Sequence, residues 1–239
     1  MEEVNICVPA YNEEDVILPT IDALCALCDS LPQYKWVITL VDNNSTDTTL
    51  QRMKEYVDTR LCVLQQPQQG KGAALSLAAQ KNTSDFFVFI DADLSADLKQ
   101  IPLFLEKIKS GFDVVVGSRF LDTAVVHRSF WRTTTSHLFR WYAEQMVPIP
   151  VSDSQCPLKM MNKRGVEILA SCKDAGWFID RELLAKAEKR RLSIIEMPIA
   201  WEEFRYPERK SKLNVARAGL QSIVSLWRIR TEVYKYPNA

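Results

Sequence analysis

Two carboxylates stand one residue apart, at Asp91 and Asp93, directly after an apolar run from Phe86 to Ile90. The run is short, aromatic and β-branched, which favours a strand buried on both faces of a sheet. Residues two apart on an extended chain point the same way, so both carboxylates can converge on one cation. Oxygen ligands of this kind favour Mg²⁺ or Mn²⁺. The alternative is a pair of solvated aspartates in a turn.

Further polar residues follow other apolar runs of the chain. They are Pro9 to Glu13, Asp42, Lys71 between two glycines, and Arg119. If the strands before them are parallel, these residues emerge at the sheet edge where open α/β sheets bind ligands. There Asp42 can accept hydrogen bonds from a base or ribose, and Lys71 can approach a base or phosphate closely. With an ion at Asp91 and Asp93, the set predicts a nucleotide-diphosphate site without a Gly-rich phosphate loop.

The elements that must position these residues read as strands alternating with helices. Strands are predicted over residues 4–8, 36–41, 61–64, 86–90 and 113–116. Helices are predicted from near Glu13, after the capping cluster at residues 42–47, and over residues 73–81 and 98–109. This alternation predicts an α/β fold, with a mostly parallel central sheet and helices on both faces. No G-x-G-x-x-G follows the first strand, which disfavours a dinucleotide site of that type.

After residue 120 the pattern changes. Residues 127–146 combine aromatic residues with arginines, which predicts an amphipathic helix or helix pair. This segment either covers the sheet or lies on a membrane surface, since basic residues with Trp and Phe suit that interface. We then predict strands over 157–161 and 193–201, and helices near 165–172, 180–190 and 215–230. The last helix carries an apolar stripe of Leu220, Ile223, Val224 and Trp227.

The 239 residues are 47% hydrophobic and 25% charged, which suits a globular chain with one large core. No apolar run reaches the roughly 18 residues that suggest a membrane span, and the acidic start lacks a signal-peptide pattern. We therefore expect a cytoplasmic protein. The six cysteines include a C-x-x-C at Cys25 and Cys28 within a predicted helix, so we expect reduced, buried thiols, with a redox motif as the alternative.

Charge is unevenly spread although the net charge is zero. Residues 1–60 carry eleven acidic against four basic residues, and residues 201–239 carry eight basic against four acidic. The basic end points towards an anionic ligand or surface. Nucleic acid is not the expected partner, because no recognised nucleic-acid-binding module accompanies the basic residues.

The succession VPAYNEE, LVDNNSTDTT, GKGAALSLA, FIDADLS and VVVGSR resembles the inverting, family-two glycosyltransferases with the A-type fold. The resemblance is nearest to the dolichyl-phosphate mannose and dolichyl-phosphate glucose synthases. It continues through DSQCPLKMM, GWFIDRELL and the Ser211-Lys212-Leu213 triplet, and so covers roughly residues 4–215. Each motif alone is unspecific, whereas their order and spacing are distinctive.

The resemblance implies a role for each matching position. The nucleotide would be held by Pro9, Ala10, Tyr11, Glu13 and Asp42, with Lys71 nearby. Asp91 would bind nucleotide or metal, and Asp93 would ligate the metal, Mg²⁺ or Mn²⁺. The acceptor phosphate would meet Arg119 and a basic residue of the segment containing Arg128 and Arg132. Asp153 and Gln155 would line the sugar and acceptor site, and Arg209, Lys210 and Lys212 would lie on a loop closing over the diphosphate.

The resemblance also implies one glycosyltransferase domain over residues 1–239. Residues 1–119 would form its nucleotide-sugar-binding half, and residues 120–239 would form its acceptor-binding half. Two departures concern the acceptor more than the donor: many members carry carboxyl-terminal membrane spans where this chain ends in Pro-Asn-Ala, and the family often has glycine at the position of Pro157.

The expected reaction moves a hexose from a nucleotide-sugar of the GDP-mannose or UDP-glucose type to a polyprenyl- or dolichyl-phosphate, with inversion at the anomeric carbon. Such an acceptor is already ionised, whereas an alcohol acceptor would need a base, for which Asp153 is the first candidate. The expected placement is peripheral, at a membrane surface.

Three alternatives remain open at the level of the sequence. The first is the same transfer to a soluble acceptor. The second is a phosphohydrolase with Asp91 as nucleophile, although that signature normally ends a first strand and here ends the fourth. The third is a nucleotide-sugar-binding protein without catalysis.

Overall fold

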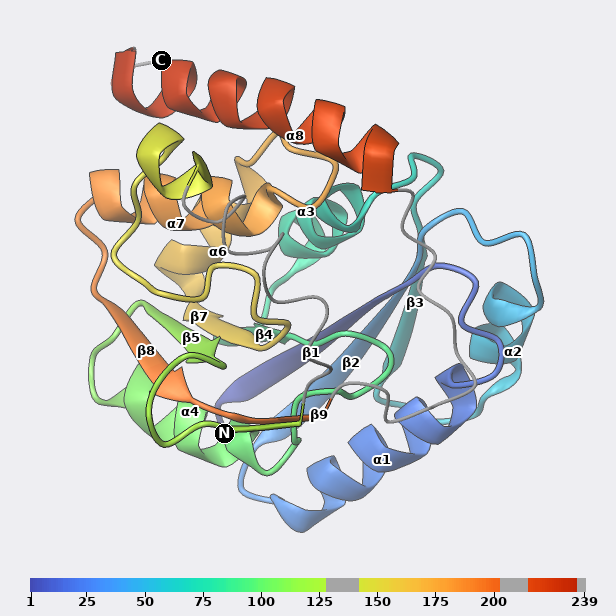
Figure 1. Ribbon diagram of the computed structural model, residues 1–239. Helices are drawn as coiled ribbons and strands as arrows, with labels where there is room; N and C mark the ends of the chain where they lie inside the picture. The colour runs from blue at the N-terminus through green and yellow to red at the C-terminus, as the bar shows by residue number, and fades with distance from the viewer. Residues whose placement is uncertain (128–141, 203–214, 236–239) are drawn as a thin grey trace.

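The computed structural model describes residues 1–127, 142–202 and 215–235, and its main sheet has the strand order β3-β2-β1-β4-β7-β5-β8 (Figure 1). The strands are β1 (Glu3–Ala10), β2 (Lys35–Asp42), β3 (Leu61–Gln65), β4 (Phe86–Phe89), β5 (Val114–Ser118), β7 (Lys159–Asn162) and β8 (Ile194–Pro198). Strand β7 lies antiparallel between β4 and β5, and the other strand pairs of this sheet are parallel. The predicted mostly parallel sheet is therefore confirmed.

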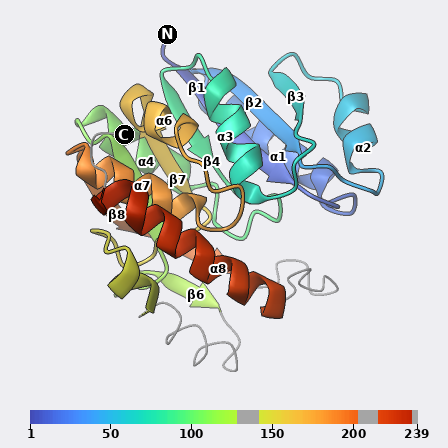
Figure 2. The ribbon, with the colours of Figure 1, turned by 90° about the horizontal axis from the view of Figure 1, so that it is seen from above.

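Helices cover both faces of this sheet, as predicted (Figures 1 and 2). One face carries α1 (Ile17–Ser30), α2 (Thr49–Glu55) and α4 (Gln100–Lys109). The other carries α3 (Lys71–Lys81), α6 (Lys163–Ala170) and α7 (Ile179–Lys189). Helix α8 (Val215–Arg230) continues into a π-helical turn, Thr231–Lys235, and packs on the outer side of α7.

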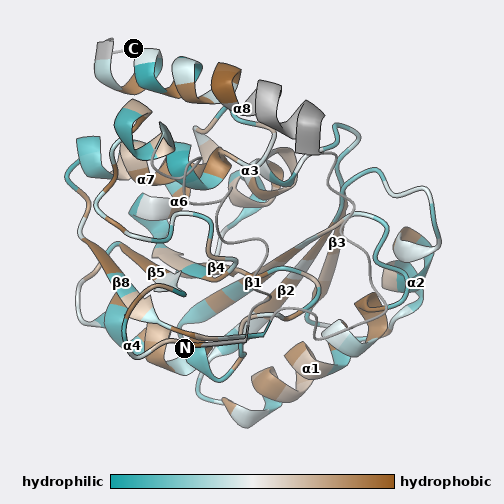
Figure 3. Ribbon diagram, viewed as in Figure 1, coloured by the Kyte–Doolittle hydropathy of each residue, from teal (hydrophilic) through white to brown (hydrophobic). Residues whose placement is uncertain are grey.

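The core consists of two clusters of buried apolar side chains, one on each face of the central strands. Figure 3 shows that these strands are made mostly of hydrophobic residues. Along β1, for example, Ile6 and Val8 pack toward α1 while Cys7 packs toward α3, because successive side chains of a strand point to opposite faces. Both layers consist of buried apolar side chains, so β4 reads in the sequence as a continuous apolar run, and β1 reads as one interrupted by Asn5. The carboxyl ends of β1 and β2 are aligned, because their last residues, Ala10 and Asp42, pair with each other.

Three local features differ from the sequence-based expectations. Helix α1 begins at Ile17, because residues 13–16 form a turn in which the Glu13 carbonyl accepts from the amides of Val16 and Ile17. The strand predicted over 193–201 is divided: after β8, strand β9 (Ala200–Glu202) leaves the main sheet and pairs with β6 (Val125–His127).

The third difference concerns α8, whose bounds match the predicted helix. Ile223, Val224 and Trp227 of the predicted stripe are 49%, 67% and 61% exposed, whereas Leu226 and Ile229 pack against α7. Of the segment predicted as an amphipathic helix, residues 142–146 are helical and 128–141 lie outside the described residues. Within the described part of the chain, no helix combines the length and the apolar character that a membrane crossing requires.

The cysteines are free thiols, and five of the six are buried as expected, whereas Cys62 is exposed. Cys25 and Cys28 are 8% and 2% exposed on the core side of α1. Burial raises the pKa of the Cys28 thiol to about 12. A thiol that stays protonated is a poor metal ligand and nucleophile, so the C-x-x-C is part of the core rather than a redox motif.

Candidate active site

The loops that follow β1, β2, β4 and β5 meet at one edge of the sheet, as the predicted strand polarity requires (Figure 1). Pro9 and Ala10 end β1, Asp42 ends β2, and Arg119 follows β5. The predicted site residues that the structure describes are thus brought to one side of the molecule. Arg128, Arg132, Arg209, Lys210 and Lys212 lie outside the described residues.

The two carboxylates of the acidic motif sit in a turn rather than on a strand. Strand β4 ends at Phe89, and the amide of Leu94 donates to the Asp91 carbonyl over 3.1 Å. Leu94 has φ +49°, a left-handed conformation that an extended chain does not contain. The predicted extended geometry of Asp91 and Asp93 is therefore wrong. The turn brings Asp93 Oδ1 to the amide of Ser95, at 3.1 Å.

A neighbouring strand holds this turn in place. The amide of Glu202 in β9 donates to the Ser95 carbonyl over 2.9 Å, and Ala96 forms a bridge with Trp201. The Trp201 ring lies 5.2 Å from the Arg119 guanidinium carbon. Strand β9 therefore links the acidic turn to the loop that carries Arg119.

Lys71, the first residue of α3, contacts the acidic turn from the other side. Its Nζ lies 2.9 Å from Asp91 Oδ1, and its side chain is 8% exposed. Burial lowers the pKa of Lys71, but the carboxylates of Asp91 and Asp180 outweigh burial and raise it overall. The two carboxylates therefore favour the charged form of the lysine. Its direct partner here is Asp91, and its contact with a nucleotide stays a prediction.

The glycines beside Lys71 allow α3 to approach another loop very closely. A Cβ on Gly70 would lie 1.9 Å from the Ala175 carbonyl oxygen, and one on Gly72 would lie 1.9 Å from that of Asp174. The amides of Gly72 and Ala73 donate to the Gly176 and Ala175 carbonyls, over 3.0 and 3.1 Å. These amides at the start of α3 are thus used within the protein, which agrees with a site without a phosphate loop.

Asp42 and the residues after β1 belong to a network of loops. Asp42 is 3% exposed, and its Oδ1 accepts from the amide of Ser45 over 3.3 Å. Asn12, beside the half-buried Tyr11 and Glu13, accepts from the amide of Thr46 over 2.7 Å. The polar turn chemistry of these segments therefore serves to join the loops after β1 and β2.

Asn43 extends this network to the loop before α3. Its Nδ2 donates to the Gln68 carbonyl over 2.7 Å, and its Oδ1 accepts from the amide of Gly70 over 2.6 Å. A buried side-chain amide that uses both ends fixes the two loops relative to each other. The loops proposed to hold the nucleotide are thus connected before any ligand binds.

Arg119 and Asp153 form a two-pronged ion pair. Nε lies 2.7 Å from Oδ2 and Nη2 lies 2.9 Å from Oδ1. Burial raises the pKa of Asp153, but hydrogen bonds from Arg119 outweigh burial and lower it overall. Glu196 of β8 accepts from the amide of Asp153 over 2.8 Å, and Gln155 is exposed two residues further on. Asp153 is thus an anchored carboxylate.

Sequence reasoning gave no role to two charged residues behind the site. Lys159 of β7 is fully buried, and its Nζ lies 2.7 Å from Asp180 Oδ1. Asp180, in the first turn of α7, also lies 4.0 Å from Lys71 Nζ through Oδ2. The signal was present in the sequence, because a lysine inside the apolar run from Pro157 to Met161 needs a buried partner.

The residues of the acidic turn have the chemistry that a divalent ion of the predicted kind would use. Asp91 remains 35% exposed and Asp93 half-buried, so both carboxylates are near the surface of the site. No cluster of three or more His, Cys, Asp or Glu side chains suitable for a metal occurs in the described ranges. Mg²⁺ commonly uses one or two carboxylates and takes its remaining ligands from substrate phosphates and water. A two-carboxylate site of that type agrees with these residues.

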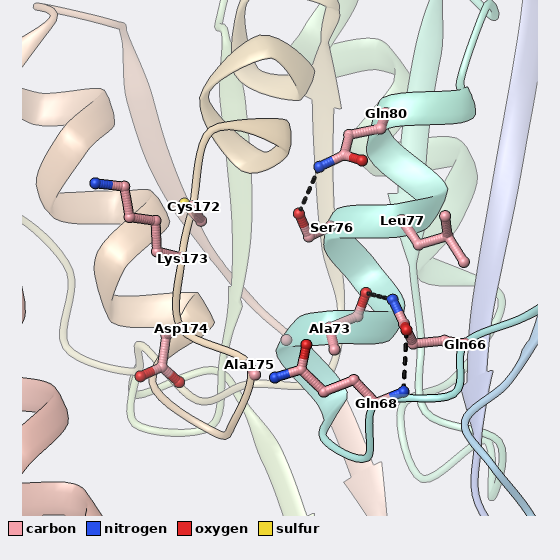
Figure 4. Close-up of a pocket in the computed structure, with 11 residues that line it drawn as sticks. Gln66, Gln68, Ala73, Ser76, Leu77, Gln80, Cys172, Lys173, Asp174 and Ala175 are labelled. Carbon is pink, nitrogen blue, oxygen red and sulfur yellow. Dashed lines mark hydrogen bonds between the residues drawn. The ribbon is translucent and has the colours of Figure 1, made fainter.

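A separate pocket of about 210 Å³ lies between α3 and residues 172–175 (Figure 4). Some of its polar groups bond to one another: Gln66 donates to the Ala73 carbonyl, and Gln80 donates to Ser76. Neither carboxylate of the acidic turn lines it. This pocket is therefore not the candidate active site.

Comparison with known proteins gives a consistent result. The model of the family described as "Glycosyl transferase family 2" matches residues 5–169. Dolichyl-phosphate beta-glucosyltransferase ALG5D of Trichomonas vaginalis is 26% identical over 248 residues, covering 95% of this chain and 76% of that protein. Glycosyltransferase AglD of Haloferax volcanii is 26% identical over 245 residues, covering 95% of this chain and 37% of that protein. The chain thus spans well under half the length of this second relative.

Solved structures share the fold. Glucosyl-3-phosphoglycerate synthase of Mycobacterium tuberculosis, crystallised with Mn²⁺, UDP-glucose and phosphoglyceric acid, superposes with a TM-score of 0.70 at 19% identity. The match covers 96% of this chain and 79% of that chain. The predicted A-type fold is thereby confirmed.

Proposed function

Because this chain belongs to glycosyl transferase family 2, we propose that it is a glycosyltransferase that transfers a hexose from a nucleotide-sugar to a polyprenyl-phosphate acceptor. The donor would be of the GDP-mannose or UDP-glucose type, and the anomeric centre would be inverted. The observation that carries the proposal is the acidic turn at the carboxyl edge of the sheet, held between Lys71 and β9. The relative named as a dolichyl-phosphate beta-glucosyltransferase supports the choice of acceptor class.

The donor would bind at the loops after β1, β2 and β4. The residues proposed to hold its nucleotide are Pro9, Ala10, Tyr11, Glu13 and Asp42. Asp91 and Asp93 would hold Mg²⁺ or Mn²⁺, which when bound would stabilise the negative charge of the departing diphosphate. Arg209, Lys210 and Lys212 would add positive charge to the same group, and one preorganised donor in such a role contributes about 3 kcal/mol.

The acceptor would bind near Arg119 and Asp153. A phosphate monoester is already ionised, so its oxygen attacks the anomeric carbon without a base, and attack opposite the leaving group turns an α-linked donor into a β-linked product. The lowered pKa of Asp153 and its ion pair with Arg119 weaken it as a base. Its proposed role is therefore to orient Arg119 toward the acceptor phosphate, with Arg128, Arg132 and Gln155 lining the same half.

The chain would reach such an acceptor from the surface of a membrane. Ile223, Val224 and Trp227 give α8 an exposed apolar face, and amphipathic helices with Trp at that face bind the interface. Peripheral contact is thus part of the proposal.

The test is incubation of purified protein with radiolabelled GDP-mannose or UDP-glucose, polyprenyl phosphate and Mn²⁺. We expect label in the organic phase, lost in Asp93→Asn and retained in Asp29→Asn. Asp29 is an exposed carboxylate at the carboxyl end of α1, at the opposite edge of the sheet. If no donor yields lipid-extractable label, the lipid acceptor is wrong. If label enters a soluble alcohol, the acceptor class changes, and unimpaired turnover by Asp93→Asn rejects the metal site.

A further inference from the structure

Four charged side chains of alternating sign run from the buried layer behind β4 to the acidic turn. Lys159 Nζ lies 2.7 Å from Asp180 Oδ1, and Asp180 Oδ2 lies 4.0 Å from Lys71 Nζ. Lys71 Nζ then lies 2.9 Å from Asp91 Oδ1. Both ammonium groups also lie over the Phe89 ring, at 5.3 and 5.6 Å from its centroid. We call Lys159, Asp180, Lys71 and Asp91 the charge chain.

The charge chain is buried at its Lys159 end and partly exposed to solvent at its Asp91 end. The side chains of Lys159, Asp180 and Lys71 are 0%, 2% and 8% exposed, whereas that of Asp91 is 35% exposed. Removing an ion from water costs several kcal/mol even after pairing, so an apolar set of the same volume would serve stability as well or better. The arrangement therefore calls for a role besides packing.

The geometry of its members indicates that role. Lys71 has its backbone fixed by the contact of Gly70 and Gly72 with residues 174–176, so its side chain enters the site from a set direction. Its ammonium sits between two carboxylates, one of which, Asp180, is held in turn by Lys159. Lys159 is itself fixed, because its Nζ also donates to the Cys156 carbonyl over 2.7 Å.

We propose that Asp180 and Lys159 are positioning residues, which hold Lys71 so that it fixes the Asp91 carboxylate for the metal and diphosphate. This inference rests on the proposed function and deepens it, since it assigns the support of the metal site to residues on β7 and α7. In proteins, partners of this kind behind a metal ligand change metal affinity by about 10–100-fold when they are removed.

The decisive variant removes Asp180 and Lys159 together, as Asp180→Asn with Lys159→Met. This double variant removes one negative and one positive charge, so the net charge of the site does not change. Lys71 and Asp91 can still pair with each other. We expect the Mn²⁺ dissociation constant, measured by titration with and without UDP or GDP, to rise about 10–100-fold. The thermal unfolding midpoint, measured alongside, reports whether the fold is kept.

The matched control removes another lysine–aspartate pair, as Lys163→Met with Asp85→Asn. These side chains pair at 2.8 Å but are 65% and 42% exposed, on the far side of β4 from the acidic turn. The control should bind Mn²⁺ as the unmodified chain does. A folded Asp180→Asn/Lys159→Met variant with unchanged Mn²⁺ affinity would overturn the positioning role.

A second variant covers the case in which the first does not fold. Lys71→Met leaves Lys159 and Asp180 paired, and it should weaken Mn²⁺ binding to the same extent. In a foldable triple variant the two losses should not add, because both act through Asp91. Full Mn²⁺ affinity in Lys71→Met would overturn the positioning role, but it would leave the metal-dependent function standing. Absence of Mn²⁺ binding by the unmodified chain instead overturns the metal-dependent function, and the positioning role with it.

Discussion

The carboxylate of Asp153 is held from two directions by Arg119. Besides the two side-chain contacts, the backbone amide of Arg119 donates to Asp153 Oδ2 over 3.1 Å. The Asp153 side chain is 2% exposed, and that of Arg119 is 17% exposed. The pair joins the end of β5 to the loop before β7, so the acceptor half of the proposed site depends on its integrity.

Arg119→Met should destabilise the fold strongly. It leaves Asp153 buried without its partner, and breaking such a pair lowers the free energy of unfolding by about 3–5 kcal/mol. Arg119→Met with Asp153→Leu should cost clearly less, because no uncompensated charge remains. Urea unfolding of the three proteins measures the difference. Equal stability of the single and double variants would contradict this account of the pair.

Acid should destabilise the contact between α7 and α8 through Glu182. Burial raises the pKa of Glu182, but hydrogen bonds from Lys186 and from the amide of Lys173 outweigh burial and lower it overall. Because the folded pKa lies below the unfolded one, the resulting stability is fully present above the unfolded pKa of about 4.3. It is lost as the pH falls through the folded pKa.

The variant Glu182→Gln isolates this effect. Its unfolding free energy should start lower near neutral pH, since Lys186 and Arg228 lose Glu182 as a charged partner, although Arg228 keeps Asp174. It should then decline less steeply below about pH 4. Urea unfolding at a series of pH values compares the two slopes. Parallel declines would show that Glu182 does not contribute to acid sensitivity.

Gly72→Ala should disturb the approach of α3 to residues 174–176. Alanine gains about 1 kcal/mol of helix propensity, but its Cβ would lie 1.9 Å from the Asp174 carbonyl oxygen. Overpacking of this kind costs about 1–3 kcal/mol. We expect lower stability and, through Lys71, weaker Mn²⁺ binding. Gly176→Ala, whose Cβ would lie 3.3 Å from the Asp174 Oδ1 atom, is the milder comparison and should cost clearly less stability than Gly72→Ala.

The sheet and the edge that carries the site could be predicted because local patterns determine them. Buried parallel strands produce apolar runs, and the polar residues at or just after the ends of β1, β2 and β5 mark the carboxyl edge. The turn at Asp91 and Asp93 could not be predicted from alternation. It depends on the left-handed Leu94 and on β9, which pairs with residues about a hundred positions earlier.

The ion pairs of the candidate site could not be predicted either, because their partners are distant in the sequence. The sequence around Lys71 does not indicate that its ammonium group contacts Asp91 and Asp180. Likewise, Arg119 pairs with Asp153, which is 34 positions away in the sequence. Such contacts depend on the order in which β4, β7 and β5 lie side by side in the sheet, and the sequence alone does not specify that order. The fold was therefore easier to predict than the electrostatics of its site.

The exposed face of α8 should bind membranes if the acceptor is a lipid. Changing Ile223, Val224 and Trp227 to serine removes three apolar side chains, each of which contributes about 1.5–3 kcal/mol when buried. Most of the variant should then remain in the supernatant after sedimentation with phosphatidylcholine–phosphatidylserine vesicles. Val57→Ser, at a position 95% exposed beyond α2, is the control and should sediment normally. If the triple variant sediments as the unmodified chain does, other residues make the membrane contact. Arg128, Arg132 and Arg140 would then be tested by changing them to glutamine.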